Sequence, residues 1–261
     1  MCLILMAYGV HPAYRLIVTA NRDEFYDRPT RPLGFWDDLP GILAGRDLKA
    51  GGTWLGMTRT GRVAAVTNFR EIASPPEGAR SRGLLVREFL CGRLSPQPYL
   101  EQVQAAGGVY PGFNLLVGDS TGIYYHSNRS RGIQKLSPGI YGLSNHLLDT
   151  PWHKVRQGKS LLRGLVQKHA GFKIGDVLRI LRRRRRPPEA LLPETGVNRT
   201  WERILSPIFI VSRAYGTRSS SVILVKTEGE VTFTERSYTP RRAGGFSRRT
   251  RTFAFSARPD P

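Results

Sequence analysis

The chain has 261 residues, with 40 lysines and arginines against 20 acidic residues, and its formal net charge at pH 7 is +20. The apolar run after Met1 is too short to span a bilayer and lacks the basic start of a signal peptide. Two cysteines, one of them at the extreme N-terminus, give no disulfide framework. We therefore expect one cytoplasmic domain over 1–261, which is long enough to bury its own core.

Two strands are predicted at the N-terminus. Residues 2–8 and 14–20 are apolar and β-rich, and they flank the turn-like segment Gly9–Pro12. An antiparallel hairpin centred near His11 would place residue 2 opposite residue 20. A second hairpin is predicted around Thr60 and Gly61, and it delivers Asn68 at a strand end.

The other predicted elements follow from turn residues and hydrophobic periodicity. In chain order they are strands at 53–58 and 62–67, helices at 81–92 and 96–106, a hairpin of 113–118 with 123–126, a strand at 140–143, helices at 151–168 and 174–184, and strands at 208–213, 220–226, 231–236 and 250–255. Cys91 falls in the first of these helices, where we expect it to be a packing residue. The chain has no internal repeat and no glycine-rich phosphate loop.

Cys2 is the strongest chemical signal in the chain. Removal of Met1 would place a thiol and a free α-amine on one residue. An α-amine titrates near pKa ~7.7–8.0, so part of it is neutral at pH 7 and can serve as a base for the thiol. The alternative is that Cys2 only opens a buried strand, because cysteine is often a small core residue.

The segment Asn21–Glu24 follows the second predicted strand and would emerge beside the N-terminus. A carboxylate there could hold the α-ammonium, and an amide or guanidinium could stabilise an oxyanion. The alternative is a polar turn that ends a strand. Alternation along a strand would send Arg22 to the face opposite Asp23.

Several ordered motifs resemble those of the NRDE family, which includes the transport and Golgi organisation proteins of eukaryotes. They are Met1-Cys2 and the segments 19–25, 51–56, 66–70, 142–146, 205–209 and 215–221. The resemblance implies an N-terminal-nucleophile (Ntn) hydrolase-like α+β fold, a four-layer αββα sandwich of two antiparallel sheets between helix layers.

The arrangement is also similar to that of the cholylglycine and penicillin V acylase group of cysteine Ntn hydrolases. This similarity implies Cys2 as nucleophile, Asp23 as the group that orients its amine, and Arg218 as a closing charge. Asn68 and Asn145 would be the hydrogen-bond donors. That group has an arginine three residues before the aspartate, where this chain has Ala20, so Arg22 is either structural or serves a different acyl group. The candidate substrate-binding residues are Asn21, Arg22, Trp54 and His146.

Two functions from different classes remain open. One is hydrolysis of a C–N amide or related acyl substrate. The other is non-catalytic handling or trafficking of haem or acyl lipid on the same fold, since cysteine or histidine can ligate haem iron. The five histidines have no zinc-ligand spacing. We predict no metal site and no resident cofactor, and the sequence indicates no particular oligomeric state.

The positive charge gathers at Arg182–Arg186, before Pro187 and Pro188, and again near the C-terminus. The first interpretation is a solvated helix end that passes into a basic surface loop around 182–190. Clustered arginine also suits nucleic-acid phosphates, anionic substrates or acidic membrane surfaces. Because no helix-turn-helix, zinc or aromatic RNA-binding motif is present, we predict no specific nucleic-acid partner.

Overall fold

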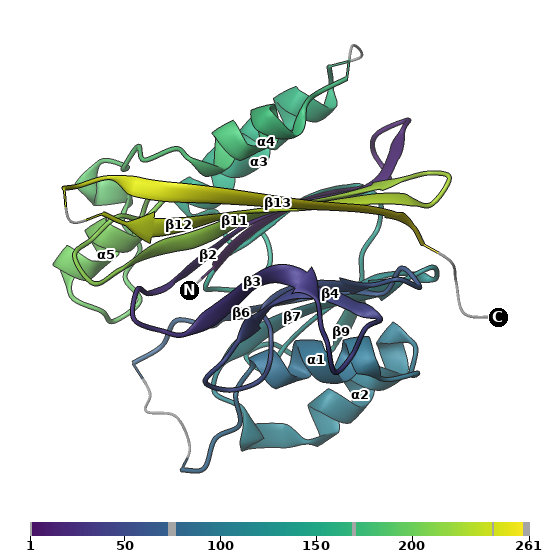
Figure 1. Cartoon of the computed structure of the whole chain (residues 1–261). Coiled ribbons are helices and arrows are strands. Elements are labelled where there is room, and N and C mark those ends of the chain that lie inside the picture. Colours follow the sequence, from purple (N-terminus) through teal and green to yellow (C-terminus); the bar gives the residue numbers. More distant parts are fainter. Residues whose placement is uncertain (1, 73–76, 169–170, 242, 258–261) are drawn as a thin grey trace. The chain divides into compact units, whose positions relative to one another are not determined.

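The computed structural model describes residues 2–72, 77–168, 171–241 and 243–257. The chain divides into two compact units, each built on one antiparallel sheet (Figure 1). Unit 1 comprises Met1–Arg28, Pro138–Ser144 and Leu148–Ala254, and unit 2 comprises Pro29–Ser137, Asn145–Leu147 and Phe255–Pro261.

The sheet of unit 1 has six strands in the order β10-β1-β2-β11-β12-β13. Its strands are β1 (Cys2–Tyr8), β2 (Tyr14–Phe25), β10 (Gly139–Leu143), β11 (Tyr215–Lys226), β12 (Glu230–Pro240) and β13 (Phe246–Ser256). Helix α3 (His153–Val166) packs against β1 and β10, and α4 (Ile174–Leu181) packs against β2 and β11 (Figure 1). The described part of this unit also contains α5 (Arg199–Leu205) and the 3-10 turn η2 (Glu189–Leu191).

Alternation along the strands explains which face of this sheet the helices cover. Leu3, Leu5 and Ala7 of β1 belong to one core cluster with apolar side chains of α3 and α4. Because side chains alternate along a strand, Cys2, Ile4 and Met6 point to the other face. The thiol therefore lies on the face of this sheet that α3 and α4 do not cover.

Gly158 sets how closely α3 approaches β1. A Cβ atom at this position would lie 2.6 Å from one terminal methyl carbon of Leu5 and 2.7 Å from the other. Leu5 is fully buried, so its side chain has little room to move away.

We expect Gly158→Ala to lower the free energy of unfolding by about 1–3 kcal/mol, because it overpacks this contact. Gly164→Ala on the same helix is the control, since its Cβ would meet no atom within 4 Å and should stabilise the helix by roughly 0.5–1 kcal/mol. Urea unfolding of both variants measures the difference. Equal effects would show that the Leu5 contact does not set the helix position.

Unit 2 has a seven-stranded sheet in which every strand pairs with its neighbours in sequence. The strands are β3 (Thr30–Phe35), β4 (Ile42–Asp47), β5 (Leu55–Thr58), β6 (Val63–Asn68), β7 (Phe113–Asp119), β8 (Gly122–Ser127) and β9 (Ile133–Lys135). Helix α1 (Gly83–Cys91) packs against β4 to β7, and α2 (Pro96–Ala105) packs against β7 to β9. A 3-10 turn, η1 (Gly107–Val109), follows α2.

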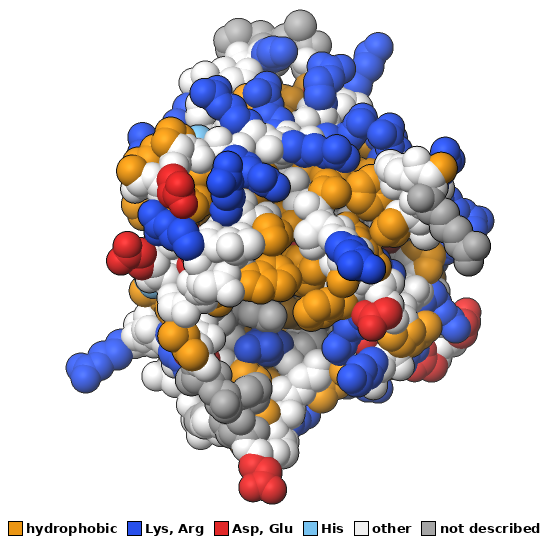
Figure 2. Space-filling view, turned by 90° about the vertical axis from the view of Figure 1, so that its left-hand side faces the viewer, with side chains coloured by type: hydrophobic (Ala, Val, Ile, Leu, Met, Phe, Trp, Pro, Cys, Tyr) orange, Lys and Arg blue, Asp and Glu red, His pale blue; other side chains and the backbone are white. Residues whose placement is uncertain are grey.

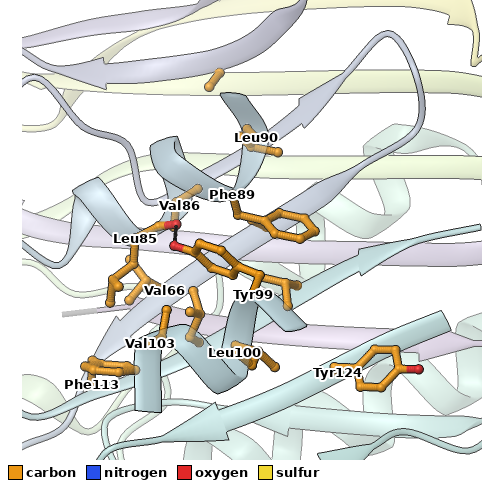
Figure 3. Packing of buried hydrophobic residues seen from close by; sticks show 14 of the residues in the cluster. Val66, Leu85, Val86, Phe89, Leu90, Tyr99, Leu100, Val103, Phe113 and Tyr124 are labelled. Carbon is orange, nitrogen blue, oxygen red and sulfur yellow. Dashed lines mark hydrogen bonds between the residues drawn. The ribbon is translucent and has the colours of Figure 1, made fainter. Parts of the chain in front are cut away.

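The core of unit 2 joins these two helices to the sheet. Phe89 of α1 and Tyr99 of α2 pack with their ring centroids 5.2 Å apart. Tyr99 also donates a hydrogen bond of 2.6 Å from its hydroxyl to the carbonyl of Leu85 (Figure 3). This bond satisfies a buried hydroxyl, so α1 and α2 are held together by packing and by a polar contact.

Most of the predicted elements are confirmed. The hairpins at 53–67 and 113–126 form, and helices occupy the predicted segments near 81–92, 96–106 and 151–168. The helix predicted at 174–184 ends earlier, at Leu181. Sequence patterns did not indicate β3, β4, β9 or α5.

Two predictions about local structure are wrong. Cys2 pairs with Arg22 rather than with residue 20, because the strands close at Tyr8 and Leu16 and the loop between them is centred on residue 12. The strand predicted at 208–213 is only an isolated bridge of Val211 with Gly216. Side chains occupy its backbone groups: the carbonyl of Ile208 accepts from Asn21, and the amide of Ile210 donates to Thr217.

Candidate functional site

Cys2, Arg22 and Ser219 form one row across three adjacent strands of unit 1. Cys2 pairs with Arg22, and Arg22 pairs with Ser219. Directly paired residues point to the same face of a sheet, so these three side chains are neighbours. All three are nearly buried, with 9%, 5% and 5% of their surface exposed. The Ser219 hydroxyl has no hydrogen-bond partner among the described residues.

Burial raises the pKa of the Cys2 thiol, because the thiolate loses its hydration. The Arg22 charge and the backbone N–H of Asp23 act in the opposite direction, while the Asp23 carboxylate adds to the rise. Ser144 donates from its hydroxyl to the Cys2 carbonyl at 3.2 Å and so fixes the start of β1. The thiol is therefore held in place and needs a base to become a nucleophile.

Asp23 lies on the helix-facing side of the same sheet, opposite Arg22, as the alternation predicted. Its Oδ1 accepts a hydrogen bond of 2.7 Å from the Thr217 hydroxyl, and its carbonyl accepts one of 2.9 Å from the Tyr215 hydroxyl. Burial raises the pKa of the Asp23 carboxyl, and the charge of Lys154 opposes that rise. The Lys154 charge and the Thr217 hydroxyl both favour the ionised carboxylate, and so they offset part of the cost of its desolvation.

Lys154 is a site residue that the sequence reasoning missed. Only 2% of its surface is exposed, and its Nζ donates to the carbonyl of Leu205 at 3.1 Å. It precedes Gly158 and Leu162 at helical spacing on the buried face of α3. A lysine in that apolar stripe was the signal that could have identified a buried counter-charge.

We expect Lys154→Met to lower the free energy of unfolding by about 3–5 kcal/mol at pH 7, because it leaves a buried carboxylate uncompensated. Adding Asp23→Asn should recover most of this loss. The loss should also shrink as the pH falls towards 4, because the raised pKa lets the folded carboxyl take up a proton while the unfolded one, with a pKa near ~3.9, is still partly ionised. Urea unfolding measures all three effects.

Lys159→Met is the matched control for this pair. Lys159 forms a more exposed ion pair with Asp149, 2.6 Å between Nζ and Oδ1, and such a pair contributes only about 0–1 kcal/mol. If the double variant lost the sum of the free energies that Lys154→Met and Asp23→Asn lose singly, the two side chains would not be coupled.

Asn21 serves the architecture of unit 1. Its amide nitrogen donates to the carbonyls of Leu181 and Ile208, both at 2.8 Å, and its oxygen accepts from Ser220 at 2.6 Å. The Asn21 side chain thus ties β2 to the end of α4 and to the segment before β11. These bonds occupy the amide, so the geometry favours an anchoring role over the predicted substrate contact.

Arg218 occupies a β-bulge between β2 and β11. Its guanidinium donates to the carbonyls of Phe25 and Arg28, at 2.7 and 3.1 Å. Burial lowers the pKa of this guanidinium, and the nearby Arg22 charge adds to the effect. Arg218 therefore holds the chain that leaves β2, next to the row that contains the thiol.

The two predicted donor asparagines lie together in unit 2. Asn145 donates from its side-chain nitrogen to the carbonyl of Asn68 at 3.0 Å, and its own carbonyl accepts from the amide of Arg70 at 2.7 Å. His146 packs its ring on Phe69 with the centroids 4.8 Å apart. Residues 145–147 are thereby fastened to the end of β6.

Trp54 and His146 both lie in packed, partly buried positions. The Trp54 ring fills the space beside Gly45, where a Cβ would approach it within 2.4 Å. Burial lowers the pKa of His146. Among the described residues, no group of three or more His, Cys, Asp or Glu side chains could hold a metal ion.

Cys91 is exposed, so its predicted packing role is wrong. The buried face of α1 is formed by Leu85, Val86, Phe89 and Leu90. Cys91 follows them on the outer side of the last turn. General thiol reagents should therefore modify the exposed Cys91 readily. The reactivity of Cys2 must be measured in a variant that lacks Cys91.

In a Cys91→Ser background, alkylation of Cys2 by iodoacetamide should rise with pH through a midpoint above the ordinary thiol pKa of ~8.5. Arg22→Gln should move this midpoint higher, because it removes a charge that favours the thiolate. Mass spectrometry of the N-terminal peptide measures the rates. A midpoint below the ordinary value, or one that ignores Arg22→Gln, would contradict this electrostatic description.

Sequence comparison identifies the family. Residues 1–240 match the family model described as Transport and Golgi organisation 2. The chain belongs to this family. It is 40% identical to the Transport and Golgi organization protein 2 homolog of Bos taurus, over 91% of this chain and 93% of that protein. Its identity to the Drosophila melanogaster Transport and Golgi organization protein 2 is 28%, over 92% and 93%.

Two solved structures share the fold. One is the Caenorhabditis elegans ortholog of N-acylethanolamine-hydrolyzing acid amidase, with a TM-score of 0.51 and 11% identity, over 85% of this chain and 92% of that chain. The other is a C2A mutant of the conjugated bile acid hydrolase from Clostridium perfringens, also at 0.51 and 11%, over 98% of both chains. The α+β class and the Ntn-hydrolase-like fold are confirmed. In the described part of the chain, no helix combines the length and apolar character needed to cross a membrane.

Proposed function

We propose that this protein is an N-terminal-cysteine hydrolase of a C–N amide or related acyl substrate. The observation that carries the proposal is the buried Cys2 thiol at the start of β1, beside Arg22 and the backbone N–H of Asp23. The two structural neighbours are named as hydrolases, but at 11% identity their likeness is one of fold. The support for the reaction comes from the residues around Cys2.

The proposed reaction begins with removal of Met1, which lies outside the described residues. The freed α-amine of Cys2 takes the thiol proton, and the thiolate attacks the substrate carbonyl carbon. The C–N bond then breaks, and the leaving amine receives the proton from the α-ammonium. Water hydrolyses the resulting thioester and releases the acid, so the thiol is regenerated.

Each residue around Cys2 has a role in the proposed reaction that follows from its charge or its hydrogen-bonding groups. Asp23, with its charge balanced by Lys154, would orient the α-ammonium through its carboxylate. Asn68 and Asn145 would supply donors to the oxyanion, as the acylase resemblance implies. Arg22 would favour the thiolate and attract an anionic or carbonyl-rich acyl group. Arg218 would act as a positioning residue through its hold on the end of β2.

The test uses protein from its native host, so that N-terminal processing is preserved. Intact mass should show a chain that begins at Cys2. N-acyl amides or a β-lactam should then acylate Cys2 and add the acyl mass to the N-terminal peptide. Cys2→Ala should abolish the adduct, whereas Cys91→Ser should leave it. Asp23→Asn should slow acylation by roughly 10²-fold or more, because the α-amine that serves as the base loses the carboxylate that orients it.

Retention of Met1, or acetylation of Cys2, would exclude the α-amine as base. The alternative, handling of haem or an acyl lipid, predicts a different outcome in the same preparation. Haem should then give a saturable Soret shift near one equivalent that persists at high salt, where non-specific contacts with the basic surface weaken. That result without any Cys2 adduct would replace the hydrolase proposal.

A further inference from the structure

The helical layer of unit 1 carries an unusual concentration of positive charge. Residues 153–186 contain twelve lysines and arginines and one acidic residue, Asp176. Lys154 is buried in the site described above. The charge of this segment therefore lies almost wholly on its outer surface, where the proposed chemistry does not use it.

Most of these cations are exposed and lack an acidic partner. Lys159 pairs with Asp149, Arg179 pairs with Asp176, and Arg184 lies over the Phe209 ring. The others are exposed and form no ion pair with a described acidic residue; they are Arg156, Arg163, Lys168, Lys173, Arg182, Arg183, Arg185 and Arg186. We refer to these eight residues as the basic surface.

The basic surface is continuous across two adjacent helices and the segment that follows them. Helices α3 and α4 pack against each other. Arg156 and Arg163 are seven residues apart and share one side of α3. The charges of Arg185 and Arg156 both act on His153, so the arginine run returns to the start of α3. Figure 2 shows many Lys and Arg side chains in the upper part of the view, on the side of unit 1 that carries these helices.

An exposed apolar side chain follows this charge in the sequence. Leu191 follows the arginine run and Pro188, and 56% of its surface is exposed. The aromatic residue within the described part of 153–186, Phe172, packs against His11 and Tyr14 instead of facing outward. Cations beside an exposed leucine suit the interface of a bilayer. Binding of nucleic acid by stacking would need an exposed aromatic ring, which the described basic surface lacks.

We propose that the basic surface and Leu191 dock this protein on a bilayer rich in anionic lipid. The cations would attract the phosphate and carboxylate headgroups, and Leu191 would enter the headgroup region. Docking of this kind leaves the other face of the sheet, with the Cys2 row, turned away from the membrane. This inference does not depend on the proposed hydrolase activity.

The test compares two triple variants that remove the same charge. Arg182, Arg185 and Arg186 are changed to Gln in one, and the exposed Arg241, Arg248 and Arg249 are changed to Gln in the other. Each lowers the formal charge from +20 to +17. Arg184 is kept because its guanidinium packs over the Phe209 ring, and Arg183 is kept so that each variant removes three charges.

Binding is measured by sedimentation with vesicles of phosphatidylcholine, alone or with about 30% phosphatidylserine, at roughly 0.1 M salt. We expect binding only to the anionic vesicles. The first triple variant should lose roughly 150-fold in partition coefficient, because three cations at about 1 kcal/mol each contribute about 3 kcal/mol. The control triple should stay within about twofold, and Leu191→Asn should lose several-fold with the charge unchanged.

Equal losses in the two triple variants would reduce the effect to net charge and overturn the proposal, as would equal binding to neutral vesicles. Tighter binding to a single-stranded RNA homopolymer, with the same dependence on the arginine run, would assign the surface to nucleic acid instead. Circular dichroism and unfolding of each variant confirm that the fold is retained. Arg182, Arg185 and Arg186 make no described side-chain hydrogen bond, so we expect no loss of stability.

Discussion

The pairing of β2 with β11 is the constraint on which the candidate site depends. The register shifts at Arg218, so Thr217 pairs with Asp23 while Ser219 pairs with Arg22. A bulge adds one residue to one strand and turns the side chains that follow it. Without this shift, β11 could not direct a hydroxyl to the Asp23 carboxylate and another to the row of Cys2 and Arg22. One extra residue thus supports polar groups on both faces of the sheet.

The two faces perform different physical tasks. On the helix-facing side, Asn21 and Asp23 satisfy backbone and hydroxyl groups that would otherwise be buried without partners. Lys154 supplies the charge that offsets the buried carboxylate. On the other side, burial raises the pKa of the Cys2 thiol and the Arg22 charge lowers it. The pKa of the Cys2 thiol therefore depends on Arg22 of the adjacent strand. Arg22 lies between Asn21 and Asp23 on β2, and the side chains of these two residues anchor that strand on its helix-facing side.

The sequence predicted the parts of the fold that local patterns determine. The apolar, β-rich run Cys2–Tyr8 and the turn residues around Gly61 and Gly122 specify hairpins from short-range chemistry. The register of the first hairpin was wrong by two residues, because turn length is not fixed by composition. The segment 208–213 was mistaken for a strand, since its apolar character is real but its backbone groups bond to Asn21 and Thr217. Only tertiary contacts reveal that competition.

The position of the Cys2 thiol at the start of a strand could be predicted from the sequence, but several of its neighbours could not. Cys2, Asp23, Asn68 and Asn145 stand in recognisable motifs, and the structure places the two asparagines together. Ser219 and Lys154 could not be assigned from motifs, because their role follows from a bulge and from the packing of a helix on a sheet. The surroundings of Asn21 point to anchoring, which illustrates that a residue in a signature motif can stabilise the fold that presents its neighbours.

The exposed positive charge of unit 1 and the Cys2 thiol lie on opposite sides of one sheet. The basic surface lies on α3, α4 and the arginine run, whereas the thiol lies on the face of the sheet that these helices do not cover. A helix layer and a sheet separate them by roughly 10 Å or more, and the Debye length in physiological salt is about 8 Å. The charges that shift the pKa of the thiol include those of Arg22 and Asp23, which lie beside it. Such a chain can gain or lose charge on this surface with little effect on the pKa of the Cys2 thiol.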